Sequence, residues 1–103
     1  MVEFVAVRSK KRAPTHPGQL LANTVLPATG KSKAEFARLL GISRQSLYDI
    51  LSGSQPVSPA TAVRLGKLCG NGPRLWLNMQ SAYDLWQAQK SVDVSKIMTL
   101  EIA

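Results

Sequence analysis

Histidine and cysteine are almost absent from this chain, and their scarcity removes several kinds of chemistry. Among 103 residues there is one of each, His16 and Cys69. A lone cysteine excludes an intrachain disulfide and suits a reducing compartment, so we expect a cytoplasmic protein. One cysteine and one histidine are also too few for the usual zinc site. The two lie far apart in the sequence, which leaves a nucleophile–base pair unsupported, and we interpret Cys69 as a small buried hydrophobe.

Acidic residues are the second shortage. Six of them stand against 13 lysines and arginines, which gives a formal net charge of +7. The acids are scattered, without the spacing of a catalytic pair or a metal site, and no glycine-rich phosphate-binding loop occurs. We therefore expect no enzyme, no cofactor and no metal. The excess of positive charge instead predicts a polyanionic partner, either nucleic acid or an anionic membrane surface.

Long apolar runs are missing as well. No run approaches the ~18 residues that a membrane-spanning helix needs. The apolar stretch at positions 2–7 contains Glu3 and is too short for the core of a signal peptide. Because these absences count against a membrane, the sequence favours nucleic acid as the partner.

The chain does have a regular series of helix start and stop signals. Serine or proline stands where helices would begin, and glycine where they would end, at short intervals through its middle. Helices this short are marginal alone in water, so they must pack on one another. The sequence predicts an all-α bundle of five helices over residues 17–26, 33–40, 44–51, 59–69 and 74–89, with the segment 27–30 breaking the first.

The second and third of these helices have the clearest ends. Ser32 and Glu35 have the spacing of a capping box, in which each side chain bonds the backbone N–H of the other residue. Gly41 ends the second helix, and Ser43 caps the third. We expect the inward faces of the two helices to carry Phe36, Leu39 and Leu40, then Leu47, Ile50 and Leu51.

This pair of short helices has the spacing of a helix-turn-helix. Ala37 lies four residues before Gly41, and Leu47 lies six after it. Two helices that cross closely need a small residue at the crossing and a glycine in the tight turn. The plainer alternative is a helical hairpin with a polar face, and the net charge favours DNA binding over it. The apolar seam that would hold the third helix in place consists of Phe36, Leu40, Ile42, Leu47 and Ile50.

The outward face of the third helix carries residue types that read DNA. The N-terminal residues of a recognition helix reach base edges in the major groove. Arg44 is suited to guanine O6 and N7, and Gln45 to adenine N6 and N7. Asp49 would repel phosphate, so we expect it at the edge of this face or paired with Arg44. The side chains suited to phosphate oxygens are Lys33, Ser43, Ser46 and Tyr48.

The fifth expected helix is rich in large side chains at helical spacing. Trp76, Met79, Tyr83 and Trp86 recur along it. The core accounts for some of them, but two tryptophans and a tyrosine exceed what so small an interior absorbs, and interfaces favour such residues. We therefore predict that they also form a dimer interface. A dimer would place two recognition helices about 34 Å apart on a palindromic site.

The two ends of the chain differ from its middle. We divide the chain into a basic N-terminal segment (1–15), a helix-turn-helix domain (16–90) and a strand-like C-terminal tail (91–103). We interpret the basic run at 8–12 as a solvated segment, the alternative being an arm that grips phosphate or the minor groove. A lone strand needs a partner: the segment 2–7, another protein or, as we hypothesise, a second chain. The apolar positions that alternate in the tail are Val92, Val94, Met98, Leu100 and Ile102.

Four stretches of the sequence resemble one known family. They are HPG at 16–18, FARLLGISR at 36–44, SPATAVRL at 58–65 and WLNMQSAYDLW at 76–86. Together they resemble the HigA-type antitoxins, phage-repressor-like helix-turn-helix proteins of bacterial toxin–antitoxin modules, over about residues 16 to 90. The last stretch is the most specific, because generic helix-turn-helix domains do not carry it. The chain departs from the family at Gln19, where glutamate is common, and in both end segments, so no toxin contact surface is carried over.

The resemblance implies a function for the whole chain. It implies a homodimer that represses its own operon, contacts double-stranded operator DNA through residues 43–48 and silences a RelE-like, ribosome-dependent mRNA-cleaving toxin. It also implies that the aromatic fifth helix serves core and dimer packing. Two alternatives stay open: a stand-alone repressor without a toxin, and an interaction module whose charge neutralises an acidic partner. Arg44 and Gln45 discriminate a DNA-reading protein from an interaction module, because only a DNA reader depends on these side chains.

Overall fold

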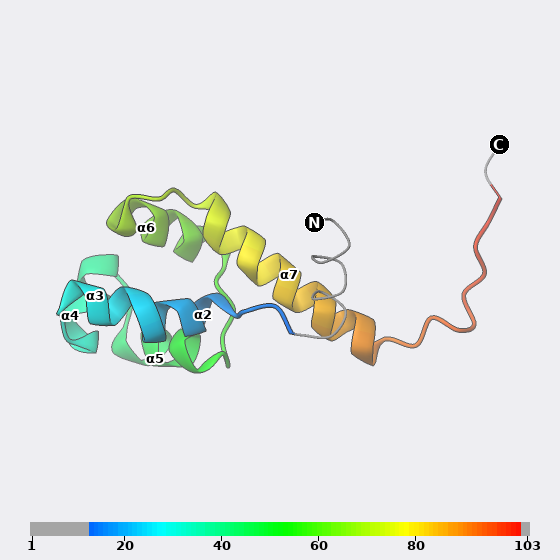
Figure 1. Ribbon diagram of the computed structural model, residues 1–103, viewed down its shortest axis with the longest axis horizontal. Helices are drawn as coiled ribbons and strands as arrows, with labels where there is room; N and C mark the ends of the chain where they lie inside the picture. The colour runs from blue at the N-terminus through cyan, green and yellow to red at the C-terminus, as the bar shows by residue number, and fades with distance from the viewer. Residues whose placement is uncertain (1–12, 102–103) are drawn as a thin grey trace.

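The computed structural model describes residues 13–101, and the regular elements in that range are all helices (Figure 1). Three elements follow one another without a gap and make the first helix: α2 (Pro17–Leu20), η1 (Leu21–Val25) and α3 (Leu26–Thr29). The remaining helices are α4 (Lys33–Leu40), α5 (Arg44–Ser52), α6 (Pro59–Cys69) and α7 (Arg74–Ser91). The prediction of an all-α fold with five helices is confirmed for this part of the chain.

The first helix does not break at Pro27, so that expectation is wrong. The helix runs through Pro27 to Thr29 and ends at Gly30. The reason is the π-helical segment η1, where the Leu26 N–H bonds the Leu21 carbonyl five residues back. A π turn is wider than an α turn, and it comes just before a proline that lacks an N–H and needs room beside the preceding turn.

Serine side chains cap the helices where the sequence predicts them. Ser32, Ser43 and Ser58 each accept a hydrogen bond from the N–H three residues on, at 3.1, 3.0 and 3.2 Å. The capping box at the start of α4 is only half formed. The Glu35 carboxylate accepts instead from the Arg38 guanidinium, with Nε at 3.0 Å. This bond holds the pKa of Glu35 below its ordinary value, and α4 begins with a local ion pair.

The core lies where the first helix, α4, α5, α6 and the start of α7 meet. The predicted seam is confirmed, with Ile42 half-buried at its margin. Leu39 is an exception: it is 40% exposed, because the inward stripe of α4 consists of Phe36, Ala37 and Leu40. The buried apolar cluster consists of Leu21, Leu26, Phe36, Ala37, Leu40, Leu47, Ile50, Val57, Ala62, Leu65 and Trp76.

The first helix sits directly against α5. A Cβ atom placed on Gly18 would lie 1.8 Å from the carbonyl oxygen of Ile50, so only glycine fits at this contact. Because α5 also packs on α4, the helix proposed to read DNA is held from two sides. Its outward face is thereby fixed relative to the rest of the bundle.

Between residues 92 and 101 the C-terminal tail is extended and exposed, and in that range it does not form the expected strand; Ile102, the basic run at 8–12 and the segment 2–7 lie outside the described residues. Figure 1 shows the last turns of α7 and the tail projecting away from the bundle. The tail contains one turn, in which the Ile97 N–H bonds the Val94 carbonyl at 3.0 Å. Its apolar side chains are left in solvent, with Met98 84% and Leu100 80% exposed. Pairing with a second chain stays a prediction.

Candidate nucleic-acid interface

Gly41 forms the turn between α4 and α5. Its φ of 78° lies in the left-handed region that glycine adopts readily. The N–H groups of Gly41 and Ile42 both bond the Ala37 carbonyl, at 2.9 and 3.1 Å. Nη1 of Arg64, on α6, donates to the Leu40 carbonyl at 3.0 Å. Arg64 therefore ties the turn to a third helix, a role that sequence spacing does not indicate.

The first turn of α5 presents Arg44 and Gln45 to solvent. Among the residues that the structure describes, no side chain pairs with Arg44, so its guanidinium is available to a ligand. The Ser43 oxygen accepts from the Ser46 N–H at 3.0 Å, which leaves its hydroxyl hydrogen for an outside acceptor. Ser46 itself is half-buried. The face that the sequence predicts for DNA therefore reaches the surface.

Lys33 and Tyr48 bring α4 and α5 together at this face. The ammonium Nζ of Lys33 lies 5.5 Å from the centroid of the Tyr48 ring, which is a cation–π distance. The Tyr48 side chain is still 44% exposed. Two side chains predicted to contact phosphate thus form one patch, which joins the start of α4 to the middle of α5.

Asp49 is bonded to Gln45 rather than to Arg44. Gln45 Nε2 donates to Asp49 Oδ1 at 2.9 Å, and the expected pairing with Arg44 is not formed. The backbone carbonyl of Asp49 accepts from the N–H groups of Ser54 and Gln55, at 2.9 and 3.0 Å. The end of α5 is therefore tied to the loop that follows it.

The aromatic side chains of α7 divide into two groups. Trp76 has no exposed surface and donates its indole N–H to Asn71 Oδ1 at 3.1 Å, so it is a core residue. This corrects its assignment to a dimer interface. Met79, Tyr83 and Trp86 are half-buried, and Lys90 Nζ lies 4.0 Å from the Trp86 ring centroid. The interface role of these three stays a prediction.

Gln80 and His16 join α7 to the rest of the bundle. Gln80 is 5% exposed and accepts from the Val57 N–H at 2.8 Å, while its Nε2 donates to Asp84 Oδ1 at 2.9 Å. His16 caps α2 by accepting from the Gly18 N–H at Nδ1, at 2.9 Å. Neither role follows from sequence spacing. Val57, the partner of Gln80, lies 23 residues away and outside α7, and a histidine ring is an unusual cap for a helix.

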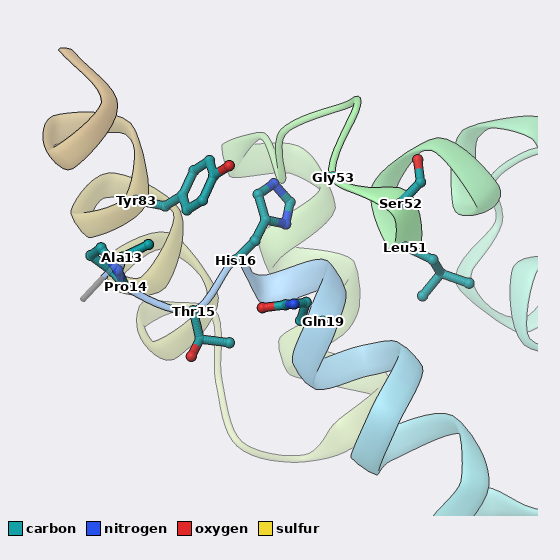
Figure 2. A pocket seen from close by; sticks show the side chains of 9 residues that line it. All are labelled: Ala13, Pro14, Thr15, His16, Gln19, Leu51, Ser52, Gly53 and Tyr83. Atoms are coloured by element: carbon teal, nitrogen blue, oxygen red, sulfur yellow. The ribbon is translucent and has the colours of Figure 1, made fainter. Parts of the chain in front are cut away.

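The rings of His16 and Tyr83 meet edge to face at the side of a cavity (Figure 2). Their centroids are 4.9 Å apart, and the interplanar angle is 82°. Burial lowers the pKa of His16 below its ordinary value of 6.5, against a weaker opposite effect of Asp84. The cavity, of ≈ 340 Å³, has no carboxylate, lysine or arginine among its described lining residues.

Three further features of residues 13–101 concern membrane spans, metal ligands and the cysteine thiol. In that range no helix is both long and apolar enough to cross a membrane. Nor do three or more potential metal ligands gather there. Cys69 is half-buried, and burial raises the pKa of its thiol, which disfavours the reactive thiolate.

Comparison with known proteins extends this description. A family model described as a helix-turn-helix domain matches residues 10–75. Antitoxin HigA-1 of Vibrio cholerae is 31% identical over 83 residues, which cover 81% of this chain and 78% of the relative. A solved addiction-module antidote protein of a HigA family from Coxiella burnetii is 34% identical, with a TM-score of 0.79 over 87% of this chain and 100% of its own. Antitoxin GraA in complex with its operator is 31% identical, with a TM-score of 0.80 over 89% of this chain and 95% of its own.

These matches agree with the helix-turn-helix geometry of α4 and α5. The domain model includes the turn at Gly41, and the structural matches, which cover 87% and 89% of this chain, extend beyond residue 75 along α7. The chain therefore belongs to the helix-turn-helix family of HigA-type antitoxins, which are regulators rather than enzymes.

Proposed function

We propose that this protein is a cytoplasmic antitoxin and autorepressor, which binds its own operator as a homodimer and silences a RelE-like mRNA-cleaving toxin. The observation that supports DNA binding is the exposed first turn of α5, where Arg44 and Gln45 lie in solvent. This turn follows the Gly41 turn, which is held by hydrogen bonds to the Ala37 carbonyl and from Arg64. The similar antitoxin GraA has a structure in complex with its operator, which supports the same use of this fold.

The proposed mechanism follows from the arrangement of the side chains. α5 enters the major groove with its N-terminal end, where Arg44 donates to guanine O6 and N7 and Gln45 pairs with adenine. The Lys33–Tyr48 patch and the hydroxyls of Ser43 and Ser46 bind phosphate oxygens, which set the register of the protein on the duplex. The net charge of +7 adds a sequence-independent attraction.

Dimerisation is proposed through the outer part of α7 and the tail. Leu85 is 59% exposed on α7, and Val92, Val94 and Ile97 are between 57% and 71% exposed beyond or near its end. Several large apolar side chains exposed along one end of the molecule are typical of an interaction site. A second copy of this chain fits the requirement, because a palindromic operator needs two recognition helices related by a two-fold axis.

The experiment that tests DNA reading compares Arg44→Ala with Arg74→Ala. Both variants lose one exposed arginine, but Arg74 lies at the start of α7, outside the helix-turn-helix. Arg44→Ala is expected to cost about 1–3 kcal/mol of operator binding and to relax sequence preference, as measured by titration of operator and unrelated duplexes. Arg74→Ala should keep the preference. Equal, sequence-independent losses in both variants would contradict the proposal and favour a protein whose charge alone binds DNA.

The toxin part is tested separately. The chain is co-expressed with the toxin encoded beside it, and cleavage of reporter mRNA on ribosomes is measured. Cleavage that falls as the antitoxin rises supports the proposal. A protein that represses its promoter but leaves every neighbouring gene product unaffected is instead a stand-alone repressor. A protein that binds a partner equally well after Arg44→Ala and shows no DNA preference is an interaction module.

A further inference from the structure

Gln45 and Asp49 form a bonded pair on the outward face of α5. They are four residues apart, which places them on the same side of a helix, and Gln45 Nε2 donates to Asp49 Oδ1 at 2.9 Å. Gln45 is exposed and Asp49 half-exposed, so neither side chain is part of the core. The pair therefore lies on the surface that faces DNA in the proposed function.

The acidic side chain of Asp49 is unexpected on a helix face that contacts DNA in the proposed function. The chain has six acids against 13 lysines and arginines, and Asp49 is placed where a carboxylate repels phosphate. It forms no ion pair within residues 13–101, where the one salt bridge joins Arg38 to Glu35. Its side-chain partner is the neutral Gln45, and an exposed hydrogen bond of this kind contributes little to stability. The position of Asp49 is therefore better explained by what it does to a ligand than by what it does for the fold.

The bond orients the Gln45 amide. A carboxylate only accepts hydrogen bonds, so the amide group facing Asp49 must be the nitrogen, and the assignment of O and N is settled by chemistry. One Nε2 hydrogen is then used, and Oε1 with the second hydrogen remains. This is one acceptor and one donor, the set that adenine N6 and N7 require. Asp49 thereby prepares Gln45 for adenine before DNA arrives.

Among residues 13–101 no group bonds the second carboxylate oxygen of Asp49, so this oxygen is available to a ligand. In the major groove it can accept only from an exocyclic amino group, of which cytosine N4 is the usual partner of an acid. Guanine O6 and thymine O4 are acceptors and would be repelled. Four residues of helix span about 6 Å, so the base in question lies within about two base pairs of the one that Gln45 reads.

We propose that Asp49 is a specificity-determining residue, which orients Gln45 toward adenine and selects a cytosine nearby through its free carboxylate oxygen. The inference rests on the proposed function, since it assumes that α5 lies in the major groove. It adds a base preference that Arg44 and Gln45 alone do not supply. The repulsion between Asp49 and phosphate also lowers the affinity for duplexes that lack this cytosine.

The test is a binding selection on duplexes with a randomised half-site, run with the unmodified chain, Asp49→Ala and Asp49→Asn. The unmodified chain should prefer cytosine over guanine or thymine by about tenfold at one position per half-site. Asp49→Ala should lose that preference, weaken the adenine preference beside it and bind unrelated duplexes more tightly. Asp49→Asn is the sharper variant, because its Oδ1 can still accept from Gln45 while its amide nitrogen now faces the base. This variant should keep the preference for adenine and should switch the preference at the neighbouring position from cytosine to guanine or thymine.

Controls separate the possible failures. Glu101→Gln removes one negative charge at an exposed position in the tail, as Asp49→Asn does on α5, and should leave every base preference unchanged. Thermal unfolding of the Asp49 variants should match that of the unmodified chain. If both variants keep the original base preferences, the inference is overturned while the proposed function stands. If the unmodified chain has no base preference at any position, the proposed function fails and this inference fails with it.

Discussion

In the helix-turn-helix, α4 and α5 begin at serine caps, end at bonded glycines and bury their apolar faces, whereas the last turns of α7 and the tail leave theirs in solvent. Phe36 and Leu47 are at most 1% exposed in the first region, and Leu85 and Leu100 are 59% and 80% exposed in the second. Both regions contain large apolar side chains, so the contrast lies in whether those side chains are buried.

The difference indicates which task each region can perform alone. A DNA-reading surface must have its side chains in place before the duplex arrives, because ordering them on binding would cost affinity. The turn at Gly41, bonded by Ala37 and Arg64, meets this requirement within one chain. Within residues 13–101, the exposed apolar side chains of the last turns of α7 and of the tail have no surface to pack against until a second protein meets them. We therefore expect the first region to be complete in the monomer and the second to be completed by a partner.

The largest expected effect compares two side chains of α7. Trp76 is fully enclosed within one chain, so Trp76→Ala should lower the free energy of unfolding by about 3–5 kcal/mol. Leu85 lies further along the same helix in solvent, so Leu85→Ala should change it by no more than about 0.5 kcal/mol at protein concentrations where the monomer prevails. Urea unfolding at several concentrations measures both. Equal losses at low concentration would show that the end of α7 is already packed in the monomer.

Removing the tail should have the next largest effect. A truncated variant ending at Lys90 loses the exposed apolar residues beyond α7, and its dimer dissociation constant should rise by about tenfold or more, which corresponds to about 1.4 kcal/mol. Sedimentation equilibrium of the truncated and full-length chains measures this change. As a matched pair within the tail, Leu100→Ser should weaken the dimer and Thr99→Ser should not. A truncated chain that dimerises and binds toxin as well as the full-length chain would refute strand pairing.

The smallest effect concerns pH and the junction between the two regions. Burial lowers the pKa of His16 in the folded chain below 6.5, so the unfolded chain binds more protons as the pH falls through that value. The contribution of neutral His16 to the free energy of unfolding is therefore fully present above about pH 6.5 and is lost as the pH falls below that value. His16→Asn keeps a capping oxygen but does not titrate there, and it should flatten that decline. Thermal unfolding of both proteins between pH 5 and 8 gives the comparison, and identical slopes would show that His16 does not cause the decline in stability.

Local signals in the sequence were sufficient for most of the fold. Ser32, Ser43 and Ser58 mark three helix starts because a serine oxygen satisfies an N–H that has no partner inside the helix. The prediction at Pro27 was wrong because a proline normally interrupts the hydrogen bonds of a helix. A π turn placed just before it removes that conflict, and no local residue pattern indicates such a turn.

The long-range polar contacts were beyond sequence reasoning. Arg64 reaches the Leu40 carbonyl across 24 residues, and Gln80 reaches the Val57 N–H across 23. Such partners depend on how whole helices pack, and one sequence does not contain that information. Trp76 shows the same limit, since helical spacing alone does not distinguish a core tryptophan from one at an interface. The sequence predicts Asp49 on the outward face of α5, but its bond to Gln45 depends on side-chain conformations that the sequence does not contain.

If one chain already contains a complete DNA-reading surface, as we propose, its preference for the operator must survive a change in salt concentration. The purified protein is titrated with the duplex upstream of its own gene and with an unrelated duplex of the same length, from about 50 to 200 mM salt. We expect a preference of ~10³-fold or more for the upstream duplex, which persists as both affinities fall with salt, and two chains bound per site. Equal affinities that fall together steeply would contradict it, because they would show that positive charge alone attracts the DNA.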